Sequence, residues 1–169
     1  MIWMVIASFL ILTLFITWIT VREKDIPQTI SEIYYLITHK GLFTLTIWTC
    51  AILLLIPCIE TWESSVKIIP ILSVFGLGLV GVAPRFKEEG ERKIHIVGAA
   101  ISGIGALLMT GWRWQLSLIL IPIIGIIITA GRLKNGENFG QKLDAWDYMF
   151  WVETTCFLIL YTTLIDKLT

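Results

Sequence analysis

The chain has 169 residues, of which 56% are hydrophobic and 15% are charged. A soluble domain carries about 25% charged residues, so this composition excludes an ordinary water-soluble fold and indicates the lipid bilayer as solvent and first partner. Because 13 basic and 13 acidic residues cancel to a formal net charge of zero, no nucleic-acid partner is expected, since binding to phosphates needs clustered excess cations.

Six apolar runs predict membrane-spanning helices, each of which needs about 17–25 residues. The predicted spans are residues 2–21, 41–58, 68–83, 94–112, 114–131 and 146–165. The runs are continuously apolar and do not alternate, which favours helices over a β-barrel. The first run is expected to be retained, because no cation precedes Arg22 as a signal peptide would require. We therefore predict an all-α fold, with residues 1–169 forming a single six-helix membrane domain.

The basic residues predict the orientation of this bundle. Six spans place ten of them on one side of the membrane: Arg22, Lys24, Lys40, Arg85, Lys87, Arg92, Lys93, Arg132, Lys134 and Lys142. The other side receives Lys67, Arg113 and Lys167. The positive-inside rule then places the first, third and fifth loops in the cytoplasm and both termini outside. We expect an integral protein of the bacterial inner-membrane or plasma-membrane type.

The first loop, REKDIPQTISEIYYLITHK, predicts a short amphipathic helix. Thr29 and Glu32 have the spacing of a capping box. Apolar residues then recur with helical periodicity at Ile30, Ile33, Tyr34 and Ile37. We expect this helix to lie on the cytoplasmic surface or to lead directly into the second span. It would serve as a membrane-surface anchor or as a lid that faces a substrate.

The links on either side of the fourth span differ in character. PRFKEEGERK, residues 84–93, predicts a solvated charged hairpin with Pro84 and Gly90 as its turn residues. GWRWQ, residues 111–115, is so short that the helices it joins are expected to be antiparallel neighbours.

Small residues form a stripe on the fourth span, with Gly98, Ser102 and Ala106 spaced by four. In lipid, helices associate where small side chains let the backbones approach, because burial of apolar surface gives little drive there. We predict that this stripe packs against a neighbouring helix. Gly76 and Gly81 make the third span the candidate neighbour.

His95 lies one turn before Gly98 on the same face, so it is expected to point into the bundle. Two interpretations stay open: a hydrogen-bonded histidine at a helix contact, or a functional acid, base or ligand. A metal site is not expected, because His39 is the second of two histidines and zinc sites use three or four protein ligands.

Glu153 stands inside the apolar run YMFWVETTCFLILY, on one face with Met149, Cys156 and Phe157. At about 1.5 Å per residue it lies roughly 10 Å inside the last span. A carboxylate at such a depth needs either a proton or a cationic partner. His95 is the first candidate for that partner, and Arg132 and Lys134 are the others. Glu153 is interpreted as a polar clamp between helices or as a carboxylate that binds a proton or a substrate.

These residues leave the function open between three hypotheses. No motif for nucleophilic catalysis or phosphate binding is present, so no catalytic residue and no cofactor is assigned. The leading hypothesis is a small non-enzymatic protein that binds a lipid, a membrane-protein partner or a second copy of itself, or an assembly component. One alternative is a proton- or small-solute-coupled carrier or channel that uses Glu153 and His95. The other is a membrane-embedded lipid hydrolase that uses Ser31, His95 and Asp147.

Overall fold

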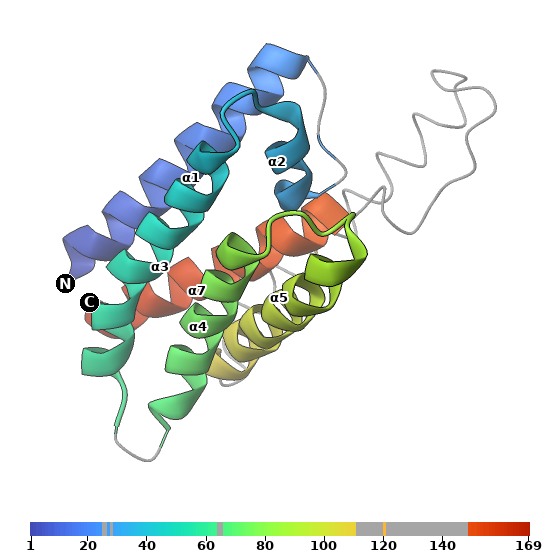
Figure 1. Cartoon of the computed structure of the whole chain (residues 1–169). Helices are drawn as coiled ribbons and strands as arrows, with labels where there is room; N and C mark the ends of the chain where they lie inside the picture. The colour runs from blue at the N-terminus through green and yellow to red at the C-terminus, as the bar shows by residue number, and fades with distance from the viewer. Residues whose placement is uncertain (25–26, 28, 64–65, 111–119, 121–148) are drawn as a thin grey trace.

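The computed structural model describes residues 1–24, 27, 29–63, 66–110, 120 and 149–169 (Figure 1). Within these residues all regular structure is helical, as the sequence predicted. The helices are α1 (Ile2–Glu23), η1 (Ile30–Glu32), α2 (Ile33–Leu36), α3 (Gly41–Thr61), α4 (Ile68–Val82), α5 (Glu89–Met109) and α7 (Met149–Leu168).

Helices α1, α3, α4 and α5 follow one another up and down the bundle, each packed against the next (Figure 1). Helix α7 packs against α5 and also contacts α1 and α3. Both chain termini lie at one end, which we call the terminal end. Helices α5 and α7 both run toward it from the opposite end, where α1 finishes and the α4–α5 loop lies.

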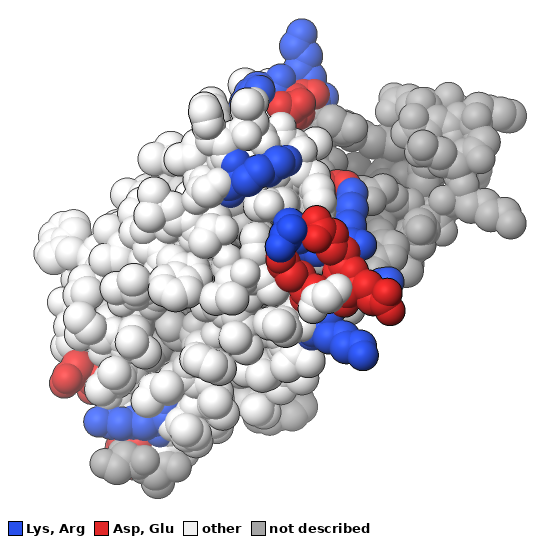
Figure 2. All heavy atoms as spheres, in the orientation of Figure 1, with Lys and Arg blue, Asp and Glu red and all other residues white. Residues whose placement is uncertain are grey.

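The bundle is apolar in its middle and charged at its two ends (Figure 2). Helices α1, α3, α5 and α7 are long and apolar enough to cross a membrane, and α4 is a shorter apolar helix of 15 residues. The prediction of a helical membrane bundle is therefore confirmed. The end opposite the termini, here the basic end, carries the described cations Arg22, Lys24, Lys40, Arg85, Lys87, Arg92 and Lys93. The predicted fifth span, residues 114–131, lies outside the described residues.

The predicted hairpin between the third and fourth spans is wrong in its second half. Helix α5 begins at Glu89, so Gly90 lies in its first turn and is not a turn residue of a loop. Glu, Arg and Lys are good helix formers. The negative charges of Glu89 and Glu91 in the first turn interact favourably with the positive end of the helix dipole. The helix therefore extends beyond the apolar run that hydropathy detects.

Helices α4 and α5 approach closely where both present small residues. A Cβ atom built on Gly98 would lie 2.8 Å from the carbonyl oxygen of Gly76. One built on Gly76 would lie 2.6 Å from the carbonyl oxygen of Gly98. Ser73 Oγ donates a hydrogen bond across the same contact to the carbonyl of Ser102, at 2.8 Å. Ala106, one turn further along α5, is also buried. The stripe on α5 thus lies against α4.

A second polar contact joins α1, α3 and α7 in the middle of the bundle. Ser8 Oγ donates to the carbonyl of Cys50 at 3.2 Å and lies 2.7 Å from the hydroxyl of Tyr161. All three residues are at most 1% exposed. Because these groups satisfy one another in apolar surroundings, they fix how the three helices pack.

Candidate functional site

The chain between α1 and α3 folds as one short helical stretch, η1 followed by α2. Its residues Ile30, Ile33 and Ile37 are at most 3% exposed, so the stretch packs into the bundle. The predicted short amphipathic helix is therefore present, but it does not lie on an outer surface. The reason is tertiary: its apolar face meets the helices of the bundle, and its ends are held by side chains from elsewhere in the chain.

The N-terminus of this stretch is capped by two oxygen-bearing side chains. Thr29 Oγ1 accepts the N–H of Glu32 at 2.9 Å, which confirms the Thr29 half of the predicted capping box. The preceding donor, the N–H of Ile30, goes to Glu153 Oε2 at 2.6 Å. The backbone of Ser31 is a second hydrogen-bonding partner of the same carboxylate. The first N–H groups of a helix lack partners within the helix, so Glu153 satisfies donors that are otherwise orphaned.

Glu153 therefore has backbone partners in place of the expected cation. Among the described residues, no hydrogen bond or ion pair joins it to His95. The positive end of the short helical stretch compensates its negative charge. This arrangement is a polar clamp, between α7 and η1.

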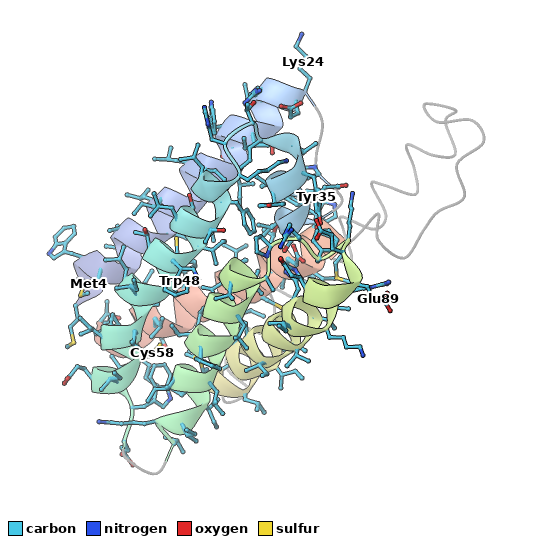
Figure 3. The ribbon with its side chains drawn as sticks, in the orientation of Figure 1. Met4, Lys24, Tyr35, Trp48, Cys58 and Glu89 are labelled. Carbon is cyan, nitrogen blue, oxygen red and sulfur yellow. The ribbon has the colours of Figure 1, made fainter. Side chains whose placement is uncertain are left out.

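The C-terminus of α2 is held by Lys40, whose Nζ donates to the carbonyls of Tyr34 and Tyr35 at 2.8 and 3.0 Å. A cation at this end complements the helix dipole. The Tyr35 side chain lies beside the α4–α5 loop (Figure 3), where its hydroxyl accepts the N–H of Lys87 at 2.9 Å. Lys87 Nζ in turn pairs with Glu32 at 2.9 Å. These contacts fasten η1 and α2 to the basic end of the bundle.

His95 is 5% exposed and lies in α5 near the same loop. Its Nδ1 is 2.8 Å from the carbonyl oxygen of Ala83. Because a carbonyl can only accept, Nδ1 carries the proton in this bond, and Nε2 is left as the acceptor of the neutral ring. The ring packs on Phe86, with 5.1 Å between centroids. His95 thus bridges α5 and the α4–α5 loop.

A cavity of about 740 Å³ lies beside both residues. Residues from η1, α3, α4, α5, α7 and the α4–α5 loop line it, and most of its surface is apolar. Glu153 and His95 both belong to the lining, together with Ser31. The volume is within the range of about 300–1,000 Å³ that is typical of sites for one small organic molecule.

The cavity has a polar end and a long apolar part. Lys87, Arg92 and Glu32 lie at the polar end, which coincides with the basic end of the bundle. The lining continues along α5 as far as Leu107. Arg92 and Leu107 are roughly 22 Å apart along the helix axis, at about 1.5 Å per residue. The cavity is therefore elongated and parallel to α5.

Among the described residues, one long side of this cavity is lined by exposed side chains. Ile96 and Ile104 of α5 are 48% and 58% exposed although they line it, and Val152 of α7 is also exposed. On the closed side, Gly103 faces α7, where a Cβ atom on Gly103 would lie 3.4 Å from Cys156 Sγ. Cys156 is the one cysteine of the three that lines the cavity, because Cys50 and Cys58 are buried in the core.

The residues of the other two functional hypotheses are partly brought together. Ser31 and His95 line one cavity, yet no hydrogen bond between them occurs in the described part of the chain, and Asp147 lies outside it. Within the same residues, no group of three metal-ligating side chains is found. The carrier and the hydrolase both stay predictions.

The sequence hypotheses missed Arg92, Lys87 and Cys156 as lining residues of one cavity. Arg92 and Lys87 were placed in a solvated loop, and Cys156 was named only as a residue on the same face as Glu153. Arg92 lies three residues before His95, and Cys156 three residues after Glu153, so each lies on the same helical face as a residue that the sequence singled out. Lys87 lies in a loop and offers no such signal.

Comparison with known proteins gives no relative: no protein-family model, no curated protein and no solved structure matches the chain.

Proposed function

We propose that this protein is a non-enzymatic membrane protein that binds one chain-bearing amphiphile, a lipid, in the cavity between η1, α5 and α7. The observation that carries the proposal is the cavity itself: about 740 Å³, elongated, mostly apolar and polar at one end. An acyl chain lies along such a cavity, and its polar group lies at the end that carries the charges.

The side with exposed side chains supports entry of the ligand from a bilayer. Ile96, Ile104 and Val152 form an apolar border between α5 and α7, and an apolar chain crosses such a border without leaving apolar surroundings. The polar end then faces the cytoplasm. The cations gathered at the basic end support this orientation, which is that of the positive-inside rule, with both termini outside and a plasma-membrane or bacterial inner-membrane location.

The clamp of Glu153 supports binding in preference to transport or hydrolysis. Its carboxylate is engaged by the backbone of Ile30 and Ser31, so it holds the wall of the cavity in place. A carboxylate that carries a proton or a cation through the protein would have to release these donors in each cycle.

The experiment is to fill the cavity and measure lipid retained by the purified protein. Gly103→Leu places a side chain directly in the cavity, because Gly103 lines it and faces Cys156. Gly78→Leu is the matched control, since a Cβ there meets nothing within 4 Å and Gly78 does not line the cavity. Native mass spectrometry from detergent micelles measures the lipid bound to each variant.

We expect wild type and Gly78→Leu to retain one lipid molecule and Gly103→Leu to retain none, with all three remaining folded. Equal retention by Gly103→Leu and Gly78→Leu, or no retention by the wild type, would overturn the proposed function.

A further inference from the structure

We propose that the ligand of this cavity is a single-chain amphiphile with an anionic head, and that Arg92 binds the head. This inference rests on the proposed function and specifies its ligand. It follows from which charges at the polar end already have partners, and from the shape of the cavity.

The other charges at the polar end are engaged within the protein. Lys87 pairs with Glu32 at 2.9 Å, and its ammonium group also lies 4.8 Å from the centre of the Tyr35 ring. Glu153 accepts backbone N–H groups at the positive end of a helical stretch. The charge of each group is therefore already compensated within the protein.

Arg92 differs from these residues. It lines the cavity and is exposed, and the described part of the chain offers its guanidinium no hydrogen bond or ion pair. Among the described residues that line the polar end, the charge without a partner is therefore one guanidinium. A guanidinium presents a planar fork of N–H donors that matches a carboxylate or a phosphate oxygen pair. A neutral head would leave this charge without a partner beside an apolar cavity.

The size and shape of the cavity favour an amphiphile with one acyl chain over a lipid with two. Its volume of about 740 Å³ is that of a site for one small organic molecule. Its long axis follows α5 from Arg92 toward Leu107, over roughly 22 Å. A head at Arg92 thus places one extended chain past Ala99 and Gly103, opposite Cys156.

Cys156 supplies the measurement. It lines the chain-binding part of the cavity, whereas Cys50 and Cys58 are 0% exposed. A bound chain therefore shields one thiol from a lipophilic maleimide. The assay measures the rate of modification of Cys156 in delipidated protein in micelles, against rising oleate or oleyl alcohol. These two probes share one chain and differ in the charge of the head.

The matched variants are Arg92→Gln and Lys93→Gln. Both remove one positive charge from the same exposed turn of α5, but Lys93 does not line the cavity. We expect oleate to protect Cys156 in the wild type and in Lys93→Gln, and to need about tenfold more in Arg92→Gln, from the loss of one charged hydrogen-bonding partner. Oleyl alcohol is expected to protect weakly and equally in all three.

Four results would overturn the inference. Equal protection by oleate and oleyl alcohol in the wild type would show that the head charge is not recognised, with the proposed function intact. An equal loss of oleate protection in Arg92→Gln and Lys93→Gln would show that general surface charge, and not Arg92, attracts the head group. Stronger protection by the two-chain lipid dioleoylphosphatidylglycerol would reject the single chain. No protection by any of these amphiphiles would overturn the proposed function as well.

Discussion

Replacing Glu153 by alanine is expected to loosen the short helical stretch that forms one wall of the cavity. The change removes the acceptor of the Ile30 N–H, at 2.6 Å, and of the Ser31 backbone. Both residues are nearly inaccessible, at 3% and 4% exposed. Water therefore cannot easily replace the lost oxygen atoms.

The magnitude follows from two opposing terms. Two buried N–H groups without acceptors cost about 1–3 kcal/mol each. Removing the carboxylate also removes the cost of holding it in apolar surroundings, which offsets part of the loss. That cost is less than the roughly 2.5–3.5 kcal/mol for a charged side chain at a bilayer centre. We expect a net loss of about 1–3 kcal/mol in the free energy of unfolding. Glu153→Gln keeps an acceptor oxygen and is expected to lose about 1 kcal/mol or less.

The assay is amide hydrogen exchange in micelles, combined with unfolding in a denaturing detergent. The amides of Ile30 and Ser31 should exchange about tenfold faster for each 1.4 kcal/mol of lost local stability. Glu60→Ala is the control, because Glu60 is an exposed carboxylate in the last turn of α3, and such substitutions usually stay within about 0.5 kcal/mol. Unchanged protection of Ile30 and Ser31 in Glu153→Ala would refute the clamp.

Three further predictions concern the packing of the helices and their ends. Gly98→Ala should lower the free energy of unfolding by about 1–3 kcal/mol, since its Cβ meets the α4 backbone at 2.8 Å. Gly78→Ala should leave that free energy unchanged, because its Cβ meets nothing within 4 Å. Equal effects of the two substitutions in detergent unfolding would contradict the close contact between α4 and α5. Tyr161→Phe removes the 2.7 Å contact with Ser8 and should lower the free energy of unfolding by about 0.5–1.5 kcal/mol in the same assay. An unchanged free energy of unfolding would contradict a stabilising role for this buried polar contact. Lys24 ends α1 in the left-handed region, at φ 55°, which glycine adopts without strain. Lys24→Gly should therefore increase the free energy of unfolding by about 0.5–1 kcal/mol and raise the thermal midpoint. A lower midpoint would show that the Lys24 side chain contributes more to stability than its backbone conformation costs.

Hydropathy predicts the helices of this protein well because a bilayer imposes one length and one composition on each span. The starts of α1, α3 and α4 coincide with the predicted starts. The start of α5 does not, because charged residues that form helices readily continue the helix into the polar region. Hydropathy detects where a helix is apolar and not where its hydrogen bonds begin.

The partner of Glu153 could not be predicted by comparing side chains, because it is a backbone N–H group, that of Ile30, 123 residues away in the sequence. Every residue except proline carries such a donor, so residue type gives no signal. The capping box at Thr29 did mark a helix N-terminus with N–H groups in need of acceptors. The sequence thus contains both halves of the contact, N–H groups without acceptors after Thr29 and a carboxylate without a cation at Glu153, but nothing in it pairs them.

Helix α4 has a further consequence for the membrane around the protein. Its 15 residues extend roughly 22 Å, whereas the hydrocarbon core of a typical bilayer is about 30 Å thick. Four apolar side chains are exposed along it, Ile68, Leu72, Phe75 and Val82, so none of the helices in the described part of the chain covers this face. Such hydrophobic mismatch is relieved when the surrounding bilayer thins, at a fraction of a kcal/mol per Å. The length of this one helix thus matches a hydrocarbon core of roughly 22 Å on that flank of the bundle.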